Sequence, residues 1–110
     1  MWNPDDRVTT DLADIFKQLG DASRLRIALC CMEADVCVTD IAERLRLSPS
    51  LVSHHLRLLR AARLVRADRR GKQVYYSLAD SHVRSVLDDM MEHVSERYET
   101  ALVPVKGGKR

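Results

Sequence analysis

Apolar residues recur at helical spacing through most of the chain and at strand spacing in one part of it. In the first periodic segment they occupy positions i, i+3, i+4 and i+7, namely Leu12, Ile15, Phe16 and Leu19. This spacing lines one face of a helix, so it predicts a helix over residues 10–19, which Gly20 ends. The polar residues 1–8 that precede it are predicted to form a loose arm.

A second helix is predicted over about residues 21–32, and a short third helix over residues 41–45. Each has two candidate N-caps: Asp21 or Ser23 for the second helix, and Thr39 or Asp40 for the third. Ser48-Pro49 then combines a capping side chain with a proline suited to a first helical position, so a fourth helix begins there and continues to about residue 62. Only Arg46 and Leu47 separate it from the third helix. Two helices joined by so short a turn predict a helix-turn-helix.

The fourth helix has two distinct faces. At 100° per residue, one side carries a stripe predicted to be buried: Val52, His55, Leu56 and Leu59. The opposite side carries Ser50, Ser53, His54 and Arg57. Small hydroxyl groups admit close approach to a base edge, and an arginine can bind guanine through two hydrogen bonds. This face therefore predicts contacts in the major groove of DNA, with a merely solvated helix face as the alternative.

A β-hairpin follows the fourth helix. Residues 64–67 and 74–78 are strand-like, and residues 68–72 between them form a basic tip that contains Gly71. A basic hairpin directly after a groove-reading helix is typical of a wing that touches phosphates, here through Arg69, Arg70 and Lys72. The fold class is therefore mainly α with a small β-hairpin, a winged helix-turn-helix. A last helix is predicted over residues 81–98.

Composition and charge agree with this assignment. The 110 residues suffice for one domain, with an ordered core over about residues 10–98, and the aromatic content of 5% favours packed helices. The net charge is only +2, but residues 57–72 hold seven basic side chains and one acid, a polyanion-facing distribution. No signal peptide or transmembrane run is visible, so we expect a cytoplasmic protein without membrane contact.

The chain resembles the ArsR/SmtB family of metal-sensing repressors. The resemblance spans about residues 12–98, and it is carried by the stretches 19–27, 37–42, 48–56 and 75–78 together with the Gly71 wing. It implies a homodimer built on the first and last helices, an inverted-repeat operator in double-stranded DNA, and an inducer that weakens DNA binding. Members of the family sense different metals or thiol chemistry, so the inducer has to be inferred from the residues.

The last predicted helix carries two pairs of metal-ligand side chains, Asp80 with His82 and His93 with Glu96. The eleven residues from His82 to His93 span about 16 Å of helix, so one ion cannot bind both within a straight helix. The pairs nevertheless share one face. An antiparallel helix pair across a two-fold axis would join the first pair of one chain to the second pair of the other.

Two imidazoles and two carboxylates suit Zn²⁺ in tetrahedral geometry, so the pattern predicts two zinc ions per dimer. The family's zinc sensors carry the same pattern in this helix. A polar helix face without metal is one alternative. Nickel or cobalt is another, although either would usually require more than four ligands.

Three cysteines offer an alternative inducer site. Cys37 lacks a second cysteine two residues later, where Thr39 stands, and residues 1–29 contain no histidine or cysteine to complete a site with Asp40. Adjacent Cys30 and Cys31 point about 100° apart on a helix, so they cannot clasp one ion together. The alternative function is therefore a repressor that senses thiol oxidation or a thiophilic species such as cadmium, lead or arsenite.

An enzymatic role is not expected. Four protein ligands would close the zinc coordination sphere and leave no position for a reactive water. The sequence also shows no nucleophile and base pair and no phosphate-binding loop, so we expect no small-molecule substrate.

Overall fold

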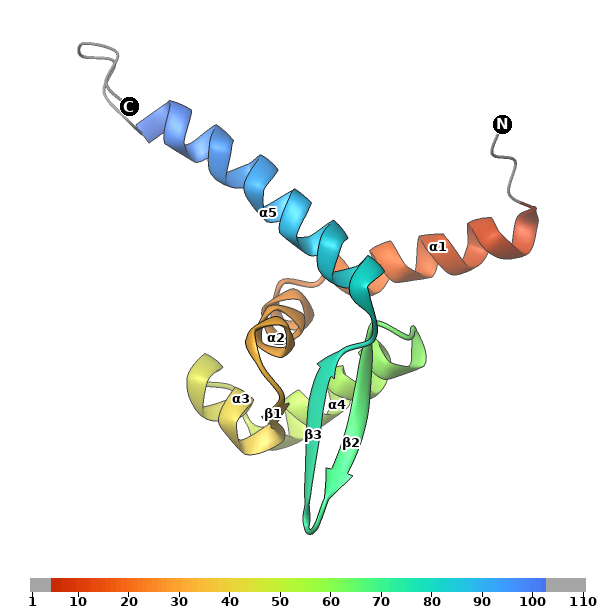
Figure 1. Cartoon of the computed structure of the whole chain (residues 1–110), viewed down its shortest axis with the longest axis vertical. Coiled ribbons are helices and arrows are strands. Elements are labelled where there is room, and N and C mark those ends of the chain that lie inside the picture. Colours follow the sequence, from red (N-terminus) through yellow and green to blue (C-terminus); the bar gives the residue numbers. More distant parts are fainter. Residues whose placement is uncertain (1–4, 103–110) are drawn as a thin grey trace. The chain divides into compact units, whose positions relative to one another are not determined.

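The structure is a computed structural model that describes residues 5–102 (Figure 1). This part of the chain holds five helices and three strands, in the order α1 (Asp6–Leu19), α2 (Ala22–Glu33), β1 (Val36–Cys37), α3 (Val38–Leu45), α4 (Pro49–Ala61), β2 (Val65–Arg70), β3 (Gln73–Leu78) and α5 (Ser81–Leu102). The elements fall into two compact units, one ending at Asp80 and one beginning at Ser81. The predicted fold class, mainly helical with a small hairpin, is confirmed. The single domain with its core over residues 10–98 stays a prediction.

Three helices begin at capping side chains. Asp21 and Ser48 cap α2 and α4 as predicted, through bonds donated by the amides of Arg24 (2.9 Å) and Leu51 (3.1 Å). The predicted start of α1 is wrong, because Asp5 accepts a bond of 3.0 Å from the amide of Val8 and the helix begins at Asp6. The remainder of the predicted arm, residues 1–4, lies outside the described residues.

The start of α3 also differs from the prediction. The helix begins at Val38, with Cys37 in the N-cap position and no side-chain capping bond, so neither Thr39 nor Asp40 opens it. The reason is β1, which leads into the helix without a linker. At the other end, Arg46 adopts a left-handed conformation with φ of 60° and completes the tight turn toward α4.

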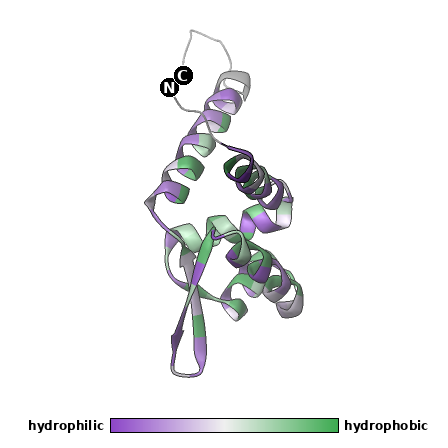
Figure 2. Ribbon diagram, turned by 90° about the vertical axis from the view of Figure 1, so that its right-hand side faces the viewer, coloured by the Kyte–Doolittle hydropathy of each residue, from purple (hydrophilic) through white to green (hydrophobic). Residues whose placement is uncertain are grey.

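The strands form one antiparallel sheet in the order β1-β3-β2. β2 and β3 pair along their whole length, from Val65 opposite Leu78 to Arg70 opposite Gln73. They therefore run through the predicted loop and leave only two turn residues, Gly71 and Lys72, where Gly71 has φ of +65°, a conformation that suits glycine. The resulting hairpin projects beyond the helices of its unit (Figure 1), and its tip is hydrophilic (Figure 2).

The core of the first unit lies between its helices and the base of the sheet. Its most deeply buried large side chains come from α2, α3, α4 and the start of the wing: Ile27, Ile41, Val52, Leu56, Leu59 and Leu64. The predicted inward stripe of α4 is confirmed, because Val52, His55, Leu56 and Leu59 are all buried. Because this stripe is buried, the opposite face of α4 must point to the solvent.

α5 forms the second unit and continues to Leu102, beyond the predicted end at residue 98. Apolar and polar residues alternate along it in Figure 2. Exposed apolar residues lie at four-residue spacing on α5, namely Val86, Met90, Val94 and Tyr98. α1 shows the same feature with Val8, Leu12 and Phe16. Among the helices of residues 5–102, none is long and apolar enough to span a membrane.

Candidate functional site

The outer face of α4 presents the four side chains predicted to read DNA. Ser50, Ser53, His54 and Arg57 are all exposed. They lie at positions i, i+3, i+4 and i+7, so they share one side of the helix. The Ser48 cap and the buried stripe on the other side hold them in place. The result is a polar helix face on which the Arg57 cation lies one turn from the hydroxyl group of Ser53 and two turns from that of Ser50.

His55 anchors this helix from behind. The ring is only 7% exposed, and its Nδ1 lies 3.3 Å from a guanidinium nitrogen of Arg24 in α2. Burial is the main reason that the pKa of His55 is lowered, although Asp21 opposes the shift. Because arginine can only donate, a neutral imidazole must accept this bond at Nδ1. A buried polar group requires a partner, but nothing in the sequence pattern identified Arg24 as that partner.

Arg24 extends this connection to a third helix. Its Nε donates to the carbonyl oxygen of Gln18, near the end of α1, over 2.9 Å. One side chain therefore joins the end of α1, the start of α2 and the middle of α4. This polar junction lies on the inner side of the helix whose outer side is the candidate reading face.

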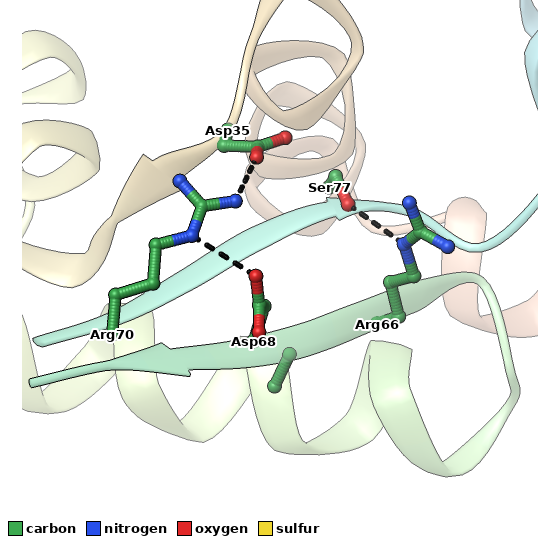
Figure 3. Close-up of a pocket in the computed structure, with 6 residues that line it drawn as sticks. Asp35, Arg66, Asp68, Arg70 and Ser77 are labelled. Carbon is green, nitrogen blue, oxygen red and sulfur yellow. Dashed lines mark hydrogen bonds and ion pairs between the residues drawn. The ribbon is translucent and has the colours of Figure 1, made fainter.

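The predicted basic residues of the wing differ in whether they form ion pairs. Arg69, Arg70 and Lys72 are all exposed, and within residues 5–102 neither Arg69 nor Lys72 forms an ion pair. Arg70, in contrast, pairs with Asp68 (Nε to Oδ2, 2.9 Å) and with Asp35 (Figure 3). These two carboxylates raise the pKa of Arg70, Asp35 making the larger contribution.

The four predicted zinc ligands lie just before α5, in its first turn and in its second half. Asp80 precedes the helix, His82 is in its first turn, and His93 and Glu96 follow further along, all with exposed side chains. In the described part of a single chain, no three His, Cys, Asp or Glu side chains come together as metal ligands. The sharing of ligands between two chains stays a prediction.

The three cysteines are free thiols in the interior. Cys30, Cys31 and Cys37 are 6%, 1% and 7% exposed. Burial raises the pKa of Cys31 to about 12, with smaller contributions from Cys30 and Asp35. Because the thiolate is the form that binds metals and reacts with oxidants, Cys31 is poorly suited to either role. Cys37 is buried, whereas Asp40, its suggested partner, is exposed.

Comparison with known proteins identifies the family. The model of the bacterial regulatory proteins of the arsR family matches residues 21–67. A transcriptional repressor SmtB homolog from Synechocystis is 44% identical over 77% of this chain, which spans 64% of that protein's length. A cadmium resistance transcriptional regulatory protein, a CadC homolog from Staphylococcus aureus, is 39% identical over 78% of this chain and 72% of its own length.

A solved structure shares the fold. The homodimeric winged helix-turn-helix DNA-binding domain of a possible ArsR-family regulator from Mycobacterium bovis superposes with a TM-score of 0.81. The match covers 94% of this chain and 99% of that domain, at 24% identity. The arrangement of α3, α4 and the β2–β3 hairpin is thus a winged helix-turn-helix, as predicted. The chain belongs to the arsR family of bacterial regulatory proteins, and it is a transcriptional regulator rather than an enzyme.

Proposed function

We propose that this protein is a zinc-responsive transcriptional repressor. In this proposal a homodimer binds an inverted-repeat operator, and it dissociates from this DNA when it binds zinc. The single observation that carries the DNA-binding part is the outer face of α4, where Ser50, Ser53, His54 and Arg57 are exposed above a fully buried stripe. Helices of this kind enter the major groove and read base edges with residues near their N-terminus. Such a regulator acts in the cytoplasm, where bacterial DNA is found.

The wing supplies the second DNA contact. Arg69 and Lys72, at the projecting end of the hairpin, are exposed cations without an ion pair among residues 5–102. Cations at such a position bind phosphates and set the register of the protein on the duplex without reading sequence. Arg70, predicted to do the same, is considered separately below.

Homodimerisation is supported by the two apolar stripes. Phe16 on α1 is 61% exposed and Tyr98 on α5 is 62% exposed, and each belongs to a row of apolar residues at four-residue spacing. Rows of this kind are expected to be covered in a stable assembly. A second copy of the chain is the proposed cover, in line with the homodimeric domain from Mycobacterium bovis.

The proposed inducer sites lie on α5 of the dimer. Asp80 and His82 of one protomer would bind one Zn²⁺ together with His93 and Glu96 of the other, giving two ions per dimer. Imidazole and carboxylate favour zinc over thiophilic metals, which prefer sulfur. The relatives named as an SmtB homolog and as a cadmium resistance regulator support metal sensing in general, and the ligand types support zinc.

The alternative inducers, an oxidant or a thiophilic metal, would act through the cysteines. The experiment that separates them measures binding to DNA from upstream of the protein's own gene. The dimer is treated in separate samples with zinc, with cadmium and with an oxidant. We expect zinc to release the DNA, and we expect His82→Ala and His93→Ala variants to bind DNA but to keep it when zinc is added. Release by the oxidant or by cadmium, with no effect of zinc, would contradict the proposal.

A further inference from the structure

Neighbouring arginines at the end of β2 point to opposite faces of the sheet. In a strand, alternate side chains share a face, so Arg66, Asp68 and Arg70 lie on one side and Arg69 lies on the other. The cross-strand pairs agree: Asp68 is opposite Tyr75, whereas Arg69 is opposite Val74. Arg69 and Arg70 therefore do not form one basic patch, although they are adjacent in the sequence.

Arg70 reaches across the whole sheet. Its guanidinium carbon lies 4.8 Å from the centre of the Tyr75 ring on β3, and its terminal nitrogen pairs with Asp35, the residue before β1. Because β3 lies between β2 and β1, this side chain connects the two strands that do not pair with each other. Figure 3 shows Arg70 extending toward both Asp35 and Asp68.

These contacts use two of the five N–H donors of Arg70 and neutralise its charge locally. The Nε group donates to Asp68 and the terminal nitrogen donates to Asp35, so two carboxylates surround one cation. An arginine binds a phosphate best through two parallel N–H groups. A phosphate that approached the remaining N–H groups of Arg70 would come close to two carboxylates, whose negative charges oppose its binding.

We propose that Arg70 is a positioning residue that fastens the wing, and that it is not a phosphate ligand. By holding β2 to the segment ahead of α3, it fixes where the wing tip lies relative to the helix-turn-helix. Arg69 and Lys72 then meet the phosphates in a defined position. The inference rests on the proposed DNA-binding function, and it revises the sequence-based expectation for Arg70.

Replacing Asp35 distinguishes the two possible roles of Arg70, phosphate ligand and positioning residue. The two roles predict changes of DNA affinity in opposite directions. If Arg70 bound phosphate, Asp35→Ala would free it, remove a negative charge and tighten DNA binding. If Arg70 fastens the wing, Asp35→Ala weakens binding by about twofold to fivefold, the range of an exposed ion pair. Glu43→Ala is the matched control, since this exposed acid of α3 forms no ion pair within residues 5–102.

Three further measurements complete the test. Arg70→Ala weakens binding at least as much as Asp35→Ala does, because it also removes the contacts with Asp68 and Tyr75, and the double variant is no worse than Arg70→Ala alone. Arg70→Lys keeps the charge but not the planar two-armed geometry, so it restores little affinity. The slope of log affinity against log salt stays unchanged for Arg70→Ala, whereas Lys72→Ala lowers it by about 1.

Amide hydrogen exchange without DNA tests the wing contact independently of the proposed function. Both Arg70→Ala and Asp35→Ala should accelerate exchange in β2 and β3 near the turn and leave α4 unchanged. If the wild-type protein binds no DNA but this acceleration is seen, the proposed function fails and the role of Arg70 in fastening the wing stands. Tighter DNA binding by Asp35→Ala, or full rescue by Arg70→Lys, would overturn the inference while leaving the proposed function intact.

Discussion

The guanidinium of Arg24 lies 3.3 Å from Nδ1 of the buried His55 imidazole, at the inner side of the helix proposed to read DNA. The same guanidinium holds the carbonyl oxygen of Gln18 at 2.9 Å. The position of α4 therefore depends on an imidazole that is neutral and accepts a hydrogen bond. A protonated ring could not accept this bond and would face a permanent cation.

Stability should consequently depend on pH through His55. Its pKa in the folded chain is lowered from 6.5, mainly by burial, so the unfolded chain takes up the proton first as the pH falls. The contribution of His55 is fully present above about pH 6.5 and is lost as the pH falls through the interval between 6.5 and the lowered value. The urea midpoint measured from pH 8 to pH 5 should decline over this interval.

The His55→Gln variant should lack this decline, although it is less stable at every pH. His54→Gln removes an exposed imidazole from the same helix and should retain it, which makes it the matched control. Two capping carboxylates, Asp5 and Asp21, also have lowered pKa values, each chiefly through a bond from a backbone amide. Their contributions disappear only as the pH falls below about 4, so they do not obscure the histidine interval. A His55→Gln variant that declines like the wild type would refute the assignment.

Arg57 and Lys72 should contribute to DNA binding in different ways. Arg57→Ala should cost about 1–3 kcal/mol on the best operator and relax the base preference at one position of each half-site. Lys72→Ala should weaken all sequences alike and flatten the dependence on salt. Binding to a library of operator variants at several salt concentrations measures both effects. The assignment of roles is wrong if the Lys72 variant changes the base preference and the Arg57 variant does not.

Zinc binding should require one ligand pair from each chain. In a mixed dimer, one chain lacks Asp80 and His82 and the other is intact. The shared-site arrangement leaves one complete site, built from the intact chain's Asp80 and His82 and the altered chain's His93 and Glu96. Zinc stoichiometry should therefore fall from two ions per dimer to one, and operator release should be partial. Retention of both sites, or loss of both, would exclude shared sites.

The cysteines should resist modification and should not be needed for the response to zinc. With a pKa of about 12, Cys31 is ionised to about one part in ten thousand at pH 8, and all three thiols are buried. Mass spectrometry after brief treatment with iodoacetamide should find the native thiols unmodified and the urea-unfolded thiols fully modified. A variant with alanine at all three positions should still release DNA with zinc. Rapid alkylation of the native protein would favour the thiol-sensing alternative.

The sequence predicted those elements whose signals are local. Ser48-Pro49 marks the start of α4 because a cap and a proline act within one helical turn, and the inward stripe of α4 follows from a 100° rotation per residue. β1 was missed because two residues, Val36 and Cys37, are too few to show alternation. The start of α3 at Val38 was not predicted for the same reason, because the helix begins directly where β1 ends, at Cys37.

The contacts of the candidate site were less predictable than its faces. Arg70 pairs with Asp35, which lies thirty-five residues earlier in the chain. His55 is hydrogen-bonded to Arg24, which lies thirty-one residues earlier. No periodicity encodes such pairs, because they depend on the order of strands in the sheet and on the packing of α2 against α4. Exposure of the outer face of α4, in contrast, required only that its apolar residues be buried.

The immediate passage from β1 into α3 has a consequence for protein engineering. In the chain, one strand of the sheet, β1, precedes α3 and α4, and the other two, β2 and β3, follow them. The wing and the strand that supports it are therefore not one contiguous segment. A chimaera that imports only residues 64–79 from a relative would pair a foreign β3 with the resident Val36–Cys37 strand. A functional graft has to include residues 35–37 as well, and an added residue should be tolerated at Gly71-Lys72 far better than between Cys37 and Val38.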